Sequence, residues 1–162
     1  QLGRGSTFYF NVALPFGELS EEADVSGDTA LLEGYRLLLV EDNELNAEIA
    51  AQLLEMQGAA VQVAPDGKQA VERFASSAPG DIQAILMDIQ MPKMNGLEAT
   101  RAIRALGRPD AASVPIIAMT ANSFQEDIDA AMQAGMNGFI AKPLDVHILY
   151  TTILDLLRKH RE

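Results

Sequence analysis

The sequence contains no cysteine. Disulfide bonds, thiolate nucleophiles and thiolate zinc sites are therefore excluded, and the composition permits a reducing compartment. No apolar run reaches the roughly 18 residues that a membrane-spanning helix needs, and the N-terminus lacks the basic and then apolar pattern of a secretion signal. We therefore expect this chain to be soluble and cytoplasmic, while a longer protein that contains it could still be anchored in the inner membrane through other segments.

Basic residues are also scarce. The 162-residue chain has 12 Lys and Arg against 23 Asp and Glu, which gives a formal net charge of −11. Such an excess of negative charge argues against contacts with a phosphate backbone, so nucleic acid is not expected as a direct ligand. The charge is unevenly spread, because residues 1–33 alone contain six acids and one base. The chain therefore divides into an acidic N-terminal part and a more balanced remainder.

The N-terminal part has the pattern of one strand followed by a linker. Residues 7–12, TFYFNV, are rich in β-forming side chains, and Pro15 closes the run. A single strand cannot bury its apolar face alone, so it belongs either to the end of another domain or to an edge of the main sheet. Residues 19–34 are acidic and contain few large apolar side chains before Leu31, which predicts a linker.

From residue 35 onward, short apolar runs alternate with amphipathic stretches. The apolar runs predict five strands, at residues 37–40, 60–64, 84–87, 115–119 and 138–141, each buried on both faces. The stretches between and after them predict five helices, at residues 44–56, 67–76, 96–106, 124–134 and 146–158. The buried face of the first helix is expected to comprise Leu45, Ile49, Leu53 and Leu54. Strict alternation predicts an α/β fold with a doubly wound, five-stranded parallel sheet covered by helices on both sides.

Ligands of such folds bind at the carboxyl ends of the strands, and in this chain those ends carry polar residues. Glu41 and Asp42 follow the first strand, Asp88 the third, Thr120 the fourth and Lys142 the fifth. Neighbouring carboxylates repel each other, so a cluster of them usually holds a cation, and oxygen ligands suit Mg²⁺. Lys142 offers a positive charge to an anion, and Thr120 offers a hydroxyl. A metal, an anion site and a carboxylate together indicate phosphoryl chemistry.

Each of these residues also has a purely structural explanation. Asp88 could cap the end of its strand, and Thr120 could be a helix N-cap. Glu41 and Asp42 could stabilise the N-terminus of the helix that follows them. Lys142 could be an ordinary surface lysine. Three asparagines are expected to cap helices or shape turns: Asn43, Asn95 and Asn122. The convergence of all the charged groups on one sheet edge favours the functional interpretation.

Four segments resemble, in order and spacing, the receiver domain of response regulators in two-component signalling: LLLVEDN, ILMDIQMPKMNG, IIAMTAN and FIAKPL. The resemblance covers residues 35–159 and implies a flavodoxin-like sheet with the strand order 2-1-3-4-5. It implies that Asp88 accepts a phosphoryl group from a phosphohistidine. It also implies that Asp42, Asp88 and the Gln90 carbonyl oxygen ligate Mg²⁺ or Mn²⁺ directly. Glu41 would act through a metal-bound water.

The same resemblance implies an anion site and a conformational switch. Thr120 and Lys142 would hold the phosphoryl oxygens, helped by backbone N–H groups near Ile89 and Ala121. The phosphoryl group would draw Thr120 towards it and free space for Phe139. Phenylalanine stands here where the family more often has tyrosine, and plain core packing is the alternative explanation for it.

The N-terminal segment GRGSTFYFNVALPFGE resembles the closing strand of the ATP-binding domain of histidine kinases. This implies a hybrid sensor histidine kinase, in which residues 1–18 end the kinase domain, residues 19–34 form a linker and residues 35–162 form the receiver. The implied partners are a histidine kinase domain and a histidine phosphotransfer protein or domain. The receiver would promote its own phosphorylation and dephosphorylation without containing the kinase site, so its status as an enzyme stays open.

Other classes of protein remain as alternatives. The first is a receiver that acts as an interaction module and never carries phosphate. An aspartate-dependent phosphohydrolase normally resembles DxDx[TV] at its nucleophile, whereas IQMP follows Asp88. A flavin-binding domain needs a hydroxyl-rich phosphate loop where this chain has two acids.

We also expect a cis peptide bond between Lys142 and Pro143, and surface positions for His147 and His160.

Overall fold

The computed structural model describes residues 31–121 and 125–161. In these residues, five parallel strands form one sheet in the order β2-β1-β3-β4-β5, and strand alternates strictly with helix. The predicted α/β architecture and the predicted strand order are therefore confirmed. The strand expected at residues 7–12, the domain end expected at residue 18, the helix start expected at residue 124 and the capping role of Asn122 lie outside the described residues.

The elements lie close to their predicted positions. They are β1 (Arg36–Val40), α1 (Glu44–Met56), β2 (Ala60–Ala64), α2 (Gly67–Ser76), β3 (Ala84–Asp88), α3 (Gly96–Arg104), β4 (Ile116–Thr120), α4 (Gln125–Ala134), β5 (Gly138–Ala141) and α5 (Val146–Arg161). The third helix ends two residues earlier than predicted, and the fifth extends three residues further. No helix in the described part of the chain is both long and apolar enough to cross a membrane.

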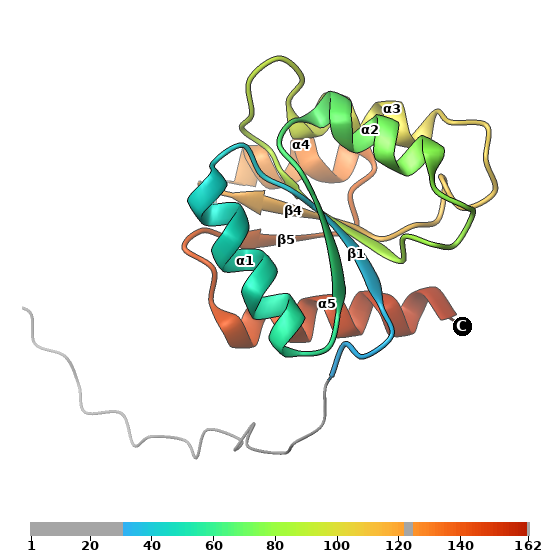
Figure 1. Cartoon of the computed structure of the whole chain (residues 1–162). Helices are drawn as coiled ribbons and strands as arrows, with labels where there is room; N and C mark the ends of the chain where they lie inside the picture. Colours follow the sequence, from blue (N-terminus) through green and yellow to red (C-terminus); the bar gives the residue numbers. More distant parts are fainter. Residues whose placement is uncertain (1–30, 122–124, 162) are drawn as a thin grey trace, which may run out of the picture.

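Helices cover both faces of the sheet (Figure 1). On the face of α1 and α5, Leu54 of α1 belongs to the same buried cluster as Leu39 of β1. On the face of α2, α3 and α4, Phe74 of α2 belongs to the same buried cluster as Leu38 of β1. Successive residues of a strand point to opposite faces, so β1 contributes alternately to the two cores.

The edge strands are less buried than predicted. Every residue of β3 and β4 is buried, and so are all the residues of β1 after Arg36. β2 and β5 have exposed or half-buried positions. The prediction that all five strands are buried on both faces is therefore wrong for these two. An edge strand has a neighbouring strand on one side only, so solvent reaches part of it.

The buried face of α1 differs from the predicted one. The buried residues are Ala47, Ala50 and Leu54, at a helical spacing of three and four. Leu45 is 64% exposed and Ile49 is 49% exposed. The small alanines bring the helix close to the sheet, and the two larger side chains lie on another side of the helix. Leu45 and Ile49 thus form an exposed apolar stripe on the first two turns of α1.

The packed body begins before residue 35. Leu32 is fully buried in the cluster beneath α1 and α5. Its N–H donates to the Gln57 carbonyl at 2.8 Å, and its carbonyl accepts from the Tyr35 N–H at 3.1 Å. The described end of the predicted linker therefore packs against the domain instead of leaving it.

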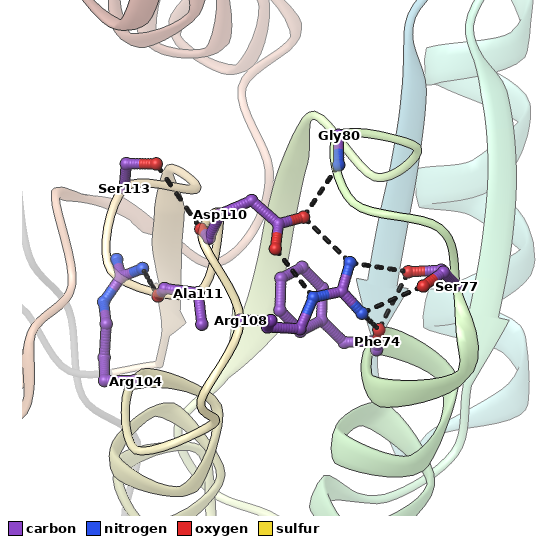
Figure 2. Close-up of polar contacts among 8 residues, drawn as sticks. All are labelled: Phe74, Ser77, Gly80, Arg104, Arg108, Asp110, Ala111 and Ser113. Carbon is purple, nitrogen blue, oxygen red and sulfur yellow. Dashed lines mark hydrogen bonds and ion pairs between the residues drawn. The ribbon is translucent and has the colours of Figure 1, made fainter.

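Two arginines hold the loop between α3 and β4 at the amino ends of the strands (Figure 2). The guanidinium of Arg108 lies 4.4 Å from the centroid of the Phe74 ring and also donates to the Phe74 carbonyl. It forms a two-pronged ion pair with Asp110, with N–O distances of 2.7 and 2.8 Å. Arg104 donates to the Ala111 carbonyl at 2.8 Å. Hydrogen bonds, an ion pair and a cation–π contact therefore hold this end of the molecule together, opposite the carboxyl ends of the strands.

Candidate functional site

The parallel register brings the polar strand ends to one edge of the sheet. The register pairs at this edge are Val40 with Met87, Asp88 with Met119, and Thr120 with Ala141. Glu41 and Asp42 directly follow the last residue of β1, and Lys142 directly follows the last residue of β5. The residues that the sequence analysis singled out therefore share one edge.

Three carboxylates form the centre of the site. One oxygen from each of Glu41, Asp42 and Asp88 lies within 4.8 Å of the other two. Glu41 and Asp88 are each 4% exposed, whereas Asp42 is exposed. Two buried acids with a third beside them place several carboxylate oxygens close together, an arrangement that suits a positive charge nearby.

Lys142 supplies positive charge to this cluster. Its Nζ lies 2.6 Å from Glu41 Oε2 and 2.6 Å from Asp88 Oδ2. The lysine side chain is 21% exposed, so its ammonium is partly withdrawn from water. The alternative that Lys142 is an ordinary surface lysine is therefore wrong.

The ion pairs and burial act in opposite directions on the pKa values. Burial raises the pKa of Asp88, and hydrogen bonds from Lys142 and from the Gln90 N–H partly offset this rise. Burial lowers the pKa of Lys142, but hydrogen bonds to Asp88 and Glu41 outweigh it, so this pKa lies above its ordinary value. The ammonium therefore stays charged at neutral pH.

Asp88 has a partner at each carboxylate oxygen. Oδ1 accepts a hydrogen bond from the Gln90 N–H at 3.0 Å, which is an Asx-type turn at the strand end. Oδ2 accepts from Lys142. Strand-end capping therefore accounts for only one of its two contacts. The N-cap of the next helix, α3, is Asn95, as predicted for that asparagine.

The start of α1 fixes Glu41. Asn46 Nδ2 lies 3.3 Å from Glu41 Oε1, and the Asn43 N–H lies 3.4 Å from the same oxygen. Asn43 is the N-cap of α1, as predicted, and accepts from the Asn46 N–H at 3.0 Å. The helix therefore uses neither Glu41 nor Asp42 as its cap. The sequence analysis did not predict the contact of Asn46 with Glu41. The position of Asn46 in the first helical turn after the acidic pair could have indicated it.

The two backbone amides that follow Asp88 have different partners. The Ile89 N–H donates to the Met119 carbonyl at 3.1 Å and so belongs to the sheet ladder. The amide that faces the Asp88 carboxylate is that of Gln90. Of the two amides, that of Gln90 therefore lies at the carboxylate, because backbone pairing with β4 continues past the last residue of β3. Ala121 is exposed at the end of β4.

The two residues of the expected switch lie in different surroundings. Thr120 is 3% exposed, and its carbonyl accepts from the Lys142 N–H at 2.8 Å. Phe139 lies on the edge strand β5 and is 41% exposed. The alternative that Phe139 is a plain core residue is therefore wrong.

The Lys142–Pro143 peptide bond is cis, as predicted.

The acidic cluster has the donor chemistry of a hard-cation site. Glu41, Asp42 and Asp88 offer carboxylate oxygens only, which suit Mg²⁺, Mn²⁺ or Ca²⁺ better than soft metals. No other group of three such side chains with this spacing occurs among the described residues. His147 and His160 are exposed on α5, as expected. The residues present therefore fit a divalent cation at this edge.

The fold, the acidic cluster and the bridging lysine together define a receiver domain. The family model of the response regulator receiver domain matches residues 37–154. The chain therefore belongs to the response regulator receiver family, which serves two-component phosphorelays.

Sensor kinases are among the relatives of this chain. It is 38% identical over 154 residues to the aerobic respiration control sensor protein ArcB of Escherichia coli, covering 93% of this chain and 19% of that protein. It is 33% identical over 160 residues to hybrid signal transduction histidine kinase I of Dictyostelium discoideum, covering 98% of this chain and 9% of that protein. The chain thus spans less than a fifth of the length of these curated relatives.

Solved receiver domains have the same fold. The receiver domain of sensor histidine kinase PA1611 from Pseudomonas aeruginosa is 38% identical, with a TM-score of 0.70 over 77% of this chain and 98% of that one. Its structure contains a magnesium ion in the active site cleft. The receiver domain of a signal transduction histidine kinase from Syntrophus aciditrophicus is 29% identical, with a TM-score of 0.67 over 77% of this chain and 91% of that one.

Proposed function

We propose that this chain is a phosphoacceptor receiver domain and that Asp88 takes a phosphoryl group from a phosphohistidine. The observation that carries the proposal is the placement of the Asp88 carboxylate. It lies at the end of β3, 2.6 Å from the ammonium of Lys142 and within the cluster of Glu41 and Asp42. A buried carboxylate with a cation beside it is a nucleophile whose charge is already compensated.

The transfer needs little from the protein beyond positioning and charge neutralisation. One carboxylate oxygen of Asp88 forms a bond to phosphorus, and the phosphorus–nitrogen bond breaks with its electron pair on the imidazole nitrogen. Lys142, which now contacts Asp88, would move its hydrogen bond to an oxygen of the phosphoryl group. The N–H of Gln90 would donate to another such oxygen, and we extend the same role to the N–H of Ala121.

Asp42 and Asp88 would hold Mg²⁺ or Mn²⁺ together with the Gln90 carbonyl oxygen, and Glu41 would contact the ion through water. Bound there, the cation would neutralise charge on the acids and on the incoming phosphoryl group. The exposed position of Asp42 supports direct ligation, since a hydrated ion can reach it. The contacts of Glu41 with Lys142 and Asn46 support an indirect role.

Thr120 would donate its hydroxyl to the phosphoryl group, and Phe139 would respond to this movement. The support is the burial of Thr120 at the end of β4 and the exposure of Phe139 on the neighbouring strand β5. A phosphoryl group would favour an inward ring position by making the hydroxyl move, and so would shift a population of two conformations.

We further propose that the chain is part of a hybrid histidine kinase in the cytoplasm, with any inner-membrane anchor in other segments of the whole protein. Residues 1–18 would be the end of a kinase ATP-binding domain. A histidine kinase domain would donate the phosphoryl group, and a histidine phosphotransfer protein or domain would receive it. The exposed apolar stripe of Leu45 and Ile49 supports a protein partner at this edge, because Leu45 lies in the first turn of α1, three residues after Asp42.

The test is phosphotransfer from a phosphohistidine donor. A ³²P-labelled histidine phosphotransfer protein is mixed with the receiver and Mg²⁺, and the label is followed by gel. We expect transfer to the wild type and to the control variant Asp81→Asn, whose carboxylate pairs with Arg36 at the other end of the sheet. Asp88→Asn should receive nothing. A folded wild type that receives no label from any donor would instead support the interaction module without phosphate.

A further inference from the structure

A buried acid outside the site contacts the loop that follows Asp88. Asp66 lies between β2 and α2, and its side chain is 6% exposed. Its Oδ1 accepts from the Gln69 N–H at 2.8 Å, so it is the N-cap of α2. Its Oδ2 lies 3.2 Å from the Nζ of Lys93, which is in the loop of residues 89–95 between β3 and α3. One carboxylate therefore ties this loop to the start of α2.

The loop makes a tight and unusual turn at Lys93. The φ angle of Lys93 is +68°, and among the described residues no other non-glycine residue has a positive φ. The Met94 N–H donates to the Pro92 carbonyl at 2.8 Å, which closes a three-residue turn around Lys93. A non-glycine residue in this region persists only where its surroundings hold it there.

Close packing against two glycines holds the same loop. A Cβ on Gly67, the first residue of α2, would lie 2.6 Å from the Met94 carbonyl oxygen. A Cβ on Gly96 would lie 2.2 Å from the Asp88 carbonyl oxygen. The Gly96 N–H donates to the Ile89 carbonyl at 3.0 Å and closes the loop. The loop thus lies directly against both α2 and the end of β3.

The Asp66 carboxylate carries the charge that this contact needs. The hydrogen bond from the Gln69 N–H lowers the pKa of Asp66, and the contact with Lys93 lowers it further against the effect of burial. The Lys93 side chain is 74% exposed, so its ammonium reaches inward from solvent to a carboxylate that is out of solvent. The capping bond fixes Asp66, and the ion pair restrains the exposed side chain of Lys93.

We propose that Asp66 is a positioning residue for phosphorylation and acts through Lys93. The pair fixes the loop so that the Gln90 N–H faces the Asp88 carboxylate at 3.0 Å. Gln90 lies three residues before Lys93, so a change of the turn at Lys93 moves this amide and its carbonyl together. This inference rests on the proposed function of Asp88 as phosphoacceptor, because the loop supplies the groups around the transferred phosphoryl.

Two substitutions remove the contact without removing the helix cap. Asp66→Asn keeps an N-cap oxygen, since asparagine caps helices as well as aspartate does, but it removes the charge that binds Lys93. Lys93→Met keeps an unbranched side chain that is one heavy atom shorter and removes the ammonium. Lys68→Met is the matched control, because Lys68 lies on α2, which Asp66 caps, and its one ion pair among the described residues is with Glu72, at 3.8 Å on the exposed surface.

The experiment measures phosphorylation by acetyl phosphate at saturating Mg²⁺ in the whole chain. Asp66→Asn and Lys93→Met should each slow it about two- to five-fold, as expected for the loss of one partly exposed ion pair. The double variant should be no slower than either single one, and the control should match the wild type. Wild-type rates in both single variants, or fully additive losses in the double variant, would overturn the proposal.

A second measurement is independent of phosphorylation. Amide hydrogen exchange at Gln90 and Gly96 should be faster in Asp66→Asn than in Lys68→Met, while the amide of Gln69 keeps its protection. Unchanged exchange at Gln90 and Gly96 would overturn the positioning role even if phosphorylation were slower. If the wild type takes no phosphoryl group, the proposed function of Asp88 fails, and the exchange data still decide whether Asp66 fixes the loop.

Discussion

The Nζ of Lys142 lies 2.6 Å from Asp88 Oδ2 and at the same distance from Glu41 Oε2, so one ammonium joins the buried acid at the end of β3 to the buried acid that follows β1. In this position, Lys142 would compete with a divalent cation for the carboxylate oxygens of Glu41 and Asp88. It is also close enough to Asp88 to contact a phosphoryl group bound there. A bound cation would replace its positive charge near the acids, and a phosphoryl group on Asp88 would offer it new oxygens. On the proposed function, the observed ion pairs would therefore be exchanged for contacts with the cation and the phosphoryl group.

Removal of that ammonium should make stability depend on Mg²⁺. Lys142→Met leaves Glu41 and Asp88 buried without a counter-charge and should cost about 2 kcal/mol of unfolding free energy in the absence of the ion. Mg²⁺ should recover much of this loss, because a divalent cation neutralises the same acids and binds only the folded state. Urea unfolding with and without Mg²⁺ measures both quantities. A large loss of Mg²⁺ affinity in this variant would contradict the role given to Lys142.

Acid should remove the contribution of one ion pair at the far end of the sheet. Hydrogen bonding to Arg108 holds the pKa of Asp110 at about 2, below its ordinary 3.8. Because the folded-state pKa is the lower one, the carboxylate stabilises the fold above about pH 4 and loses this effect as the pH falls towards 2. Asp110→Asn should therefore cost about 2 kcal/mol at pH 7 and almost nothing near pH 2.

Denaturant unfolding at a series of pH values tests this dependence. Asp81→Asn is the control, since the Arg36–Asp81 pair is more exposed and should contribute at most about 1 kcal/mol. A deficit of Asp110→Asn that stays constant down to pH 2 would show that the loss has another cause.

The segment before β1 should contribute to stability. Leu32→Ala removes a fully buried side chain and should cost about 3 kcal/mol of unfolding free energy. Leu31→Ala, at a neighbouring position that is 36% exposed, should cost less than about 0.5 kcal/mol. Equal effects of the two substitutions in thermal or denaturant unfolding would mean that Leu32 does not anchor the segment.

The exposed apolar stripe on α1 should matter to a protein donor and not to a small one. Leu45→Glu places a charge beside the site and should slow transfer from a phosphorylated histidine phosphotransfer protein about tenfold or more, as loss of an interface anchor does. Labelling by acetyl phosphate should be unchanged. Met56→Glu, at the far end of the same helix and 77% exposed, is the control. Equal slowing by both variants, or slowing of acetyl phosphate labelling, would contradict docking at the stripe.

The fold was largely predictable because its signal is repeated along the chain. Five apolar runs alternating with helical patterns imply a parallel sheet, and chain connectivity then brings Glu41, Asp88 and Lys142 to one edge without any knowledge of side-chain positions. Helix caps such as Asn43 were equally predictable from the sequence, since capping depends on the few residues around the cap.

Features that depend on contacts between distant segments were not predictable. Periodicity placed Leu45 and Ile49 in the core, but the alanines on the other side of α1 pack closer to the sheet. The sequence did not show that the Ile89 N–H pairs with the Met119 carbonyl of β4, which leaves the Gln90 N–H at the Asp88 carboxylate. Asp66 and Lys93 lie 27 positions apart in sequence, and only the folded structure shows their contact.

The central claim is that Asp88 is the phosphoacceptor, and one measurement tests it most directly. The folded chain is incubated with ³²P-labelled acetyl phosphate and Mg²⁺, and the label is tested for stability in acid and base. The account predicts a Mg²⁺-dependent label on the wild type that is stable in acid and lost in base, that persists in Asp81→Asn and that is absent from Asp88→Asn. No label on the folded wild type, or an equal label on folded Asp88→Asn, would contradict it.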